Sequence, residues 1–171
     1  MSRPTPSGRE KVLGEDDLIV SKTDLRGVIT YGNRSFIAFS GYGEEELLGA
    51  PHNLIRHPDM PRAVFQLLWE RIQAGREVFA YVVNLSKDGS HYWVLANVMV
   101  ARDAQDQPVG YYSVRRKPRP SSIQAVSALY AAMRDVEQRL GGTEGMSAAR
   151  KLLEDLCAQK GGTYDQVVLG L

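Results

Sequence analysis

Short apolar runs bounded by turn residues predict five β-strands. Two runs lie near the N-terminus, and a turn that ends in Gly27 joins them into a hairpin. Three more follow the middle of the chain, and an Asp88-Gly89 signal marks the first of the turns between them. We expect one antiparallel sheet built from strands at residues 18–25, 28–31, 78–85, 91–101 and 109–116.

Apolar residues at helical spacing predict helices between the strands and after them. Asn33 is the expected N-cap of a short helix, a second turn of helix covers 44–48, and a longer amphipathic helix runs from Pro61 to near Gly75. Together with the strands, this order indicates an α+β fold with the helices on one face of the sheet.

The residues after the last strand predict a separate helical unit. A basic, proline-rich break at 117–120 ends the sheet, and Ser121 is the expected cap of a helix through Leu140. A second helix at 147–159 completes an α-hairpin, while 163–171 fits a short helix or a tail. We therefore divide the chain into a flexible arm (1–16), a domain (17–118) and a C-terminal helical extension (119–171).

Composition narrows the class of protein. Of 171 residues, 43% are hydrophobic and 24% charged, which is typical of a globular protein. The net charge of +1 shows no excess of basic residues of the kind that nucleic-acid binding needs. No apolar run is long enough for a signal peptide or a membrane span. We expect a cytoplasmic protein with no direct membrane insertion. The one cysteine, Cys157, excludes an internal disulfide.

The stretch from His52 to Pro61 concentrates two histidines, an arginine, an aspartate and two prolines in ten residues. Its prolines stiffen the backbone, and Asp59 is placed to cap the helix expected to start at Pro61. Arg56 suits a phosphate oxyanion, and its alternative is a surface ion pair with Asp59. His57 either contacts a ligand or braces the turn. We interpret the stretch as a stiff turn aimed at a ligand.

Polar residues in the apolar strands are further candidates. Asn84 and Asn97 carry amides that need partners when they are buried, and Trp93 can stack on a ring or pack in the core. By alternation, Trp93, Leu95 and Asn97 share one face of their strand. We expect Asn84, Trp93 and Asn97 on the back wall of a pocket.

The sequence contains no motif for zinc binding or for catalysis. The histidines at 52, 57 and 91 lack the spacing of a zinc pair, although His52 or His57 stays open as an axial ligand of haem. There is no Gly-x-Ser-x-Gly elbow, no phosphate loop and no pair of carboxylates in an apolar frame. We therefore expect a protein that is not an enzyme.

The order of strands and helices resembles that of PAS domains, and the residues narrow the resemblance. The run Arg56-His57-Pro58-Asp59-Met60-Pro61, followed by His91-Tyr92-Trp93-Val94, is similar to the flavin-binding PAS domains of the aerotaxis-receptor type, the Aer and CetB group. The resemblance covers roughly residues 18–130. It implies a PAS fold, and the family's FAD-linked residues match here as Asn33, Arg56, His57 and Asp59.

The resemblance also implies a function. In this family, a non-covalently bound FAD reports the redox state of the cell, and the output is energy taxis. Members that carry their own membrane anchor signal through it, whereas this sequence has none, so a separate chemotaxis or membrane transducer and a homodimer are expected. Val78 departs from the family's tryptophan, and Phe79 faces the other way if the strand is regular. The alternatives are a cofactor-free PAS interaction module and a haem-binding gas sensor.

Overall fold

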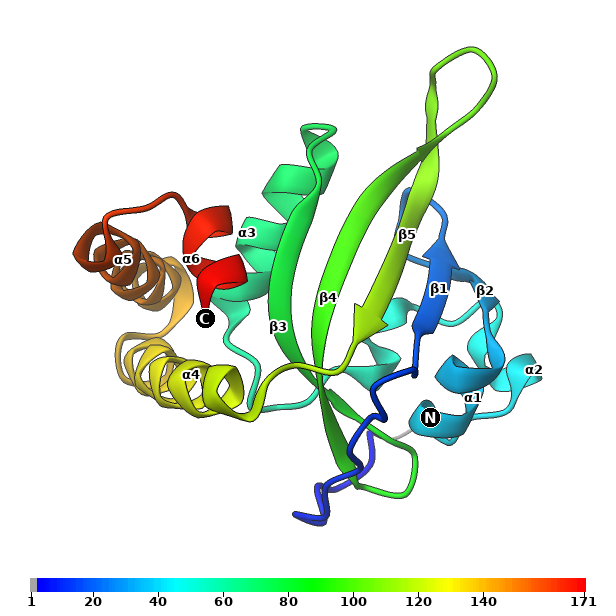
Figure 1. Ribbon diagram of the computed structural model, residues 1–171, viewed down its shortest axis with the longest axis horizontal. Coiled ribbons are helices and arrows are strands. Elements are labelled where there is room, and N and C mark those ends of the chain that lie inside the picture. Colours follow the sequence, from blue (N-terminus) through cyan, green and yellow to red (C-terminus); the bar gives the residue numbers. More distant parts are fainter. Residues whose placement is uncertain (1–2) are drawn as a thin grey trace.

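The computed structural model describes residues 3–171 and is built around one antiparallel sheet (Figure 1). Its strand order is β2-β1-β5-β4-β3, and every neighbouring pair is antiparallel. The predicted α+β class and all five strands are confirmed. The strands are β1 (Ile19–Thr23), β2 (Ile29–Gly32), β3 (Val78–Leu85), β4 (His91–Arg102) and β5 (Pro108–Arg116).

Four helical segments connect β2 to β3 and lie over the inner face of the sheet. The Asn33 side chain accepts a hydrogen bond from the Phe36 amide at 2.9 Å, so its predicted role as the N-cap of the first helix is confirmed. Gly41, with φ of 72°, ends that helix in the left-handed conformation. The segments are α1 (Arg34–Ser40), α2 (Glu44–Leu47), the 3₁₀ turn η1 (His52–Ile55) and α3 (Arg62–Gln73).

The start of α3 differs from the prediction. The helix begins at Arg62, Pro61 is the extended residue before it, and no cap comes from the preceding loop. Asp59 instead forms an ion pair with Arg134, so its predicted capping role is wrong. The cap comes from Glu137, whose carboxylate accepts hydrogen bonds from the first two amides of α3. A tertiary contact has replaced the local one.

Alternation along β3 and β4 separates the two faces of the sheet. Asn84 pairs with Tyr92, and both side chains are buried on the inner face toward α3. Trp93 faces the other way and stacks on Tyr130, with ring centroids 6.2 Å apart. The predicted alternation of β4 is therefore confirmed.

Three C-terminal helices pack beyond β3 (Figure 1): α4 (Pro120–Leu140), α5 (Gly142–Lys160) and α6 (Tyr164–Gly170). The Tyr130 hydroxyl donates to the Tyr81 carbonyl at 2.7 Å, which fixes α4 against β3. The predicted α-hairpin is confirmed. However, α4 starts one residue before Ser121, and Gly141 alone separates α4 from α5. Residues 164–170 form a helix rather than a tail.

The N-terminal segment lies along the β3–β4 turn, whereas its polar composition predicts a flexible arm. The Ser7 amide donates to the Gly89 carbonyl and the Lys11 amide to the His91 carbonyl, each at 2.8 Å. Leu13 is only 2% exposed, so it belongs to the core. One buried leucine and a few backbone bonds hold the segment. Residues 1 and 2 of the predicted arm lie outside the described residues.

Across residues 3–171, no helix combines the length and the apolar character that crossing a bilayer requires.

Candidate functional site

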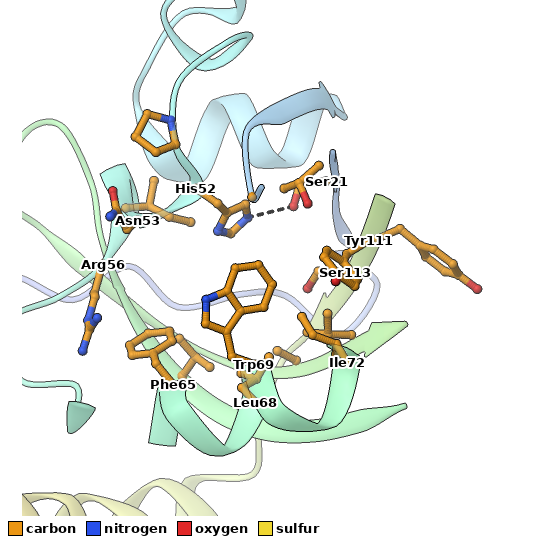
Figure 2. Close-up of a pocket in the computed structure, with 18 of the residues that line it drawn as sticks. Ser21, His52, Asn53, Arg56, Phe65, Leu68, Trp69, Ile72, Tyr111 and Ser113 are labelled. Atoms are coloured by element: carbon orange, nitrogen blue, oxygen red, sulfur yellow. Dashed lines mark hydrogen bonds between the residues drawn. The ribbon is translucent and has the colours of Figure 1, made fainter. Parts of the chain in front are cut away.

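A cavity of about 380 Å³ lies between the inner face of the sheet and the helical segments η1 and α3. Such a volume falls within the ~300–1,000 Å³ of small-molecule pockets. Figure 2 shows its labelled lining residues, which come from β1, η1, α3 and β5, except for Arg56, which directly follows η1. Its polar and aromatic lining includes Ser21, His52, Arg56, Phe65, Trp69, Asn84 and Arg115, together with the apolar Leu68.

The walls of the cavity are apolar. Phe65, Leu68 and Trp69 project from α3, because positions three and four apart share one face of a helix (Figure 2). Val82 and Ala96 line the cavity from the sheet. Two apolar surfaces that face each other suit a flat aromatic ring, which gains both burial and stacking there.

The inner end of the cavity is polar and centres on Arg115, which is 2% exposed. Its guanidinium donates to the Ser21 hydroxyl and lies 4.9 Å above the Phe36 ring. Burial lowers the pKa of Arg115 to about 10, with the nearby Tyr92 opposing the shift, so the group keeps its charge at neutral pH. Within residues 3–171, Arg115 forms no ion pair with a carboxylate.

His52 completes this polar end. Burial, and then the positive charge of Arg115, lower the pKa of His52 to about 3, so the ring is neutral. Its Nε2 lies 3.0 Å from the Ser21 hydroxyl. That hydroxyl accepts from Arg115 and still has its own proton to donate to Nε2, an arrangement in which His52 carries its proton on Nδ1.

Several buried donors near this end have no partner among the described residues. They are Nε and Nη1 of Arg115 and Nδ2 of Asn84, and both residues line the cavity. A buried polar group without a partner costs about 1–3 kcal/mol. A ligand whose edge carries oxygen or nitrogen acceptors would remove that cost, so the unpaired donors indicate a binding site.

Arg56 lies at another part of the wall, where its guanidinium stacks 4.0 Å above the Phe65 ring (Figure 2). Burial lowers its pKa, and the charges of Arg3 and Arg62 add to the shift, while Glu137 opposes it. Across the part of the chain that the structure describes, its guanidinium makes no hydrogen bond or ion pair. Its donors are therefore free for an anionic group such as a phosphate.

Of the seven candidate residues from the sequence, the structure places Arg56 and Asn84 on the cavity wall. Asn33 lies outside the lining, since its amide caps α1 and also donates to the Leu18 carbonyl at 2.8 Å. His57 lies outside too and braces the turn, because its Nδ1 accepts from the Asp59 amide at 3.0 Å. Asp59 points to Arg134 instead of the cavity.

Trp93 and Asn97 are not on the back wall, so that expectation is wrong. Both side chains face α4 and solvent, where Asn97 donates to Glu77 at 2.7 Å. Alternation showed that the two share a face but gave no sign of which face was inner.

Two residues of the polar end, Ser21 and Arg115, were not predicted from the sequence. Arg115 could have been found by alternation, because it lies on the same face of β5 as Tyr111, which is a core residue.

Val78 is buried against Ile72 and Tyr111 on the inner face. Phe79 faces the opposite side, as alternation predicts. Trp69 of α3 meets the Tyr111 ring edge-on at 5.5 Å. Aromatic surface therefore reaches this region from α3 rather than from β3.

Neither His52 nor His57 is placed to serve as the axial ligand of a haem in the cavity. Ser21 occupies Nε2 of His52, and His57 does not line the cavity. In residues 3–171, no group of three or more His, Cys, Asp or Glu side chains is arranged to hold a metal ion. Cys157 lies on α5, outside the cavity.

Comparison with known proteins agrees with this architecture. The chain is 40% identical over 133 residues to the aerotaxis receptor of Escherichia coli (strain K12), covering 77% of the chain and 26% of the receptor. It is 27% identical over 97 residues to the nitrogen fixation regulatory protein of Klebsiella pneumoniae, covering 57% and 20%. The chain thus spans about a quarter or less of the length of these relatives.

The fold has solved counterparts as well. A light-oxygen-voltage domain from a flavin-analogue study matches with a TM-score of 0.56 and 22% identity, over 64% of this chain and 82% of that one. At that identity the likeness shows the fold alone. The family model described as the PAS fold matches residues 29–115, about half of the chain. The chain therefore belongs to the PAS family, and its PAS domain is of the aerotaxis-receptor type.

Proposed function

We propose that the chain is a cytoplasmic, FAD-binding PAS redox sensor that signals to a separate transducer in energy taxis. The observation that carries the proposal is the set of unpaired donors of Arg115 and Asn84 beside an apolar slot. Two comparisons support it: one relative is named an aerotaxis receptor, and one fold neighbour is a light-oxygen-voltage domain studied with a flavin analogue.

The residues of the cavity fit a flavin dinucleotide. Phe65, Leu68 and Trp69 would cover the ring and keep water from it. Asn84 offers both a donor and an acceptor to the polar edge of the ring, and Arg115 offers two free donors. Arg56 would hold a phosphate. A ring edge bound there would give Arg115 and Asn84 the partners that they lack.

When bound, a flavin supplies reversible gain and loss of electrons. The contribution of the chain is electrostatic. Arg115 keeps its positive charge at neutral pH and has no carboxylate partner in the described residues, so it favours negative charge at the inner end of the cavity. Neutral His52 adds no second charge there. Attachment would be non-covalent, since the sole cysteine lies on α5.

The partner is part of the same proposal. A redox sensor of this type passes its signal to a chemotaxis or membrane transducer, and the E. coli relative is named a receptor. A homodimer is proposed as well. The apolar stripe of α4 does not argue for it, because Val126, Tyr130 and Met133 are buried within this one chain.

The test compares two asparagines on opposite faces of the sheet. We expect Asn84→Ala to weaken the binding of FAD to the flavin-free protein by about tenfold or more, because a buried hydrogen bond of ~1.5 kcal/mol is lost. Asn97→Ala, whose side chain faces Glu77, is the matched control and should bind as the wild type does. Titration of flavin fluorescence measures both. Equal binding by the two variants would contradict the proposed site.

A further inference from the structure

The N-terminus of α3 is held by a residue of α4. Glu137 accepts a hydrogen bond from the Arg62 amide at 2.9 Å and another from the Ala63 amide at 2.8 Å, across 75 and 74 residues of sequence. Pro61 supplies no side-chain cap. The first-turn amides of α3 thus have their side-chain acceptor on the C-terminal extension, at the positive end of the helix dipole.

The same helix end supports the proposed ligand site. Phe65 follows one turn after the capped amides, and the Arg56 guanidinium stacks on its ring at 4.0 Å. The carboxylate of Glu137 also lies close enough to Arg56 to raise its pKa against the effect of burial. A loosened first turn of α3 would therefore displace both Phe65 and Arg56.

Other contacts join the C-terminal helices to this region. Arg134 pairs with Asp59 in the loop before α3, and Arg150 of α5 lies 3.2 Å from Glu70. These pairs are partly exposed, and exposed pairs contribute little individually. Glu137 differs because its partners are backbone amides that have no other side-chain acceptor.

We infer that Glu137 is a positioning residue that makes α4 part of the ligand-binding site. The inference rests on the proposed function, because it assumes that FAD occupies the cavity. Docking of α4 and binding of FAD are then coupled, and by linkage each strengthens the other. The C-terminal helices report occupancy of the cavity through the start of α3.

The experiment uses the full chain and two measurements. FAD affinity is measured by fluorescence titration, and the amide hydrogen exchange of α3 and α4 is followed with and without FAD. We expect Glu137→Ala to weaken FAD binding at least about fivefold, the lower end of the usual range for coupled sites. FAD should slow exchange in α4 of the wild type and leave α4 of this variant unaffected.

Two further variants separate positioning from charge. Glu137→Gln keeps an acceptor and should lose less affinity than Glu137→Ala, and it carries the test if the alanine variant does not fold. Asp135→Asn removes a carboxylate from the same helix that pairs only with Arg139 in the described residues, and it should match the wild type. Tighter FAD binding in both Glu137 variants would overturn the inference, since charge repulsion would then explain the link.

Unchanged affinity together with unchanged exchange in Glu137→Ala would also overturn the inference, while the proposed function would stand. A wild type and an Asp135→Asn variant that both fail to bind FAD would overturn the proposed function itself, and the inference with it.

Discussion

Replacing His52 by glutamine should remove a specific part of the acid sensitivity of the ligand-free protein. The half-buried ring is neutral, its pKa is lowered to about 3, and its Nε2 lies 3.0 Å from the Ser21 hydroxyl. Between pH 3 and 6.5 the unfolded chain therefore binds a proton that the folded chain does not. Stability from neutral His52 is complete above pH 6.5 and is lost as the pH falls toward 3.

The magnitude follows from the size of the shift. At pH 5 the solution lies about 1.5 pH units below the ordinary histidine pKa, which corresponds to ~2 kcal/mol of lost stability at 1.36 kcal/mol per unit. The His52 ring borders a cavity that water can enter, which reduces the cost of charging it. We therefore expect a loss of about 1–2 kcal/mol between pH 8 and pH 5 from this residue.

The assay is urea denaturation of the wild type and of His52→Gln at pH 8 and pH 5. Glutamine has a carbonyl that can accept from Ser21 and does not titrate. The other titrating groups are shared, so they cancel in the comparison of the two proteins. The variant should lose about 1–2 kcal/mol less than the wild type on acidification. An equal loss in both proteins would refute the assignment of a neutral His52 with a lowered pKa.

Three further substitutions test the packing. Leu13→Ala should cost about 2–4 kcal/mol in urea denaturation because Leu13 is in the core, whereas Val12→Ala, 66% exposed, should change little; equal effects would mean that the arm is not docked. Tyr130→Phe should cost about 1–2 kcal/mol by leaving a strand carbonyl unpaired, and an unchanged midpoint would contradict that bond. Gly110→Ala should lower the thermal midpoint markedly, since its new methyl group would collide with the Thr23 carbonyl; a normal midpoint would show that the two strands can move apart.

The sheet was predicted well from the sequence, because each strand is determined by its own residue types and by the turns beside it. The run 78–85 was placed without error, since valines and aromatics lie between a glycine-ended helix and an Asp88-Gly89 turn. Asn33 was also identified as a cap, because Phe36, whose amide it accepts a hydrogen bond from, is only three residues further along the chain. Such features depend on neighbours in sequence, which a single chain displays directly.

The site was predicted less completely, because its geometry depends on long-range contacts. Alternation grouped Trp93 with Asn97 but could not say which face α3 would cover, and the outer face was chosen. The polar end joins Ser21 to Arg115 across 94 residues, and neither has a sequence motif. In the same way, the cap of α3 by Glu137 replaced the nearby Asp59.

The most direct test of the central claim is the absorbance spectrum of the full chain as isolated, with the released cofactor quantified. We expect a yellow protein that carries close to one FAD per chain and loses it on mild denaturation, because the cavity would hold it without a covalent bond. A colourless protein that takes up no FAD on titration, or one with a Soret band instead, would show that FAD is not the ligand of this cavity.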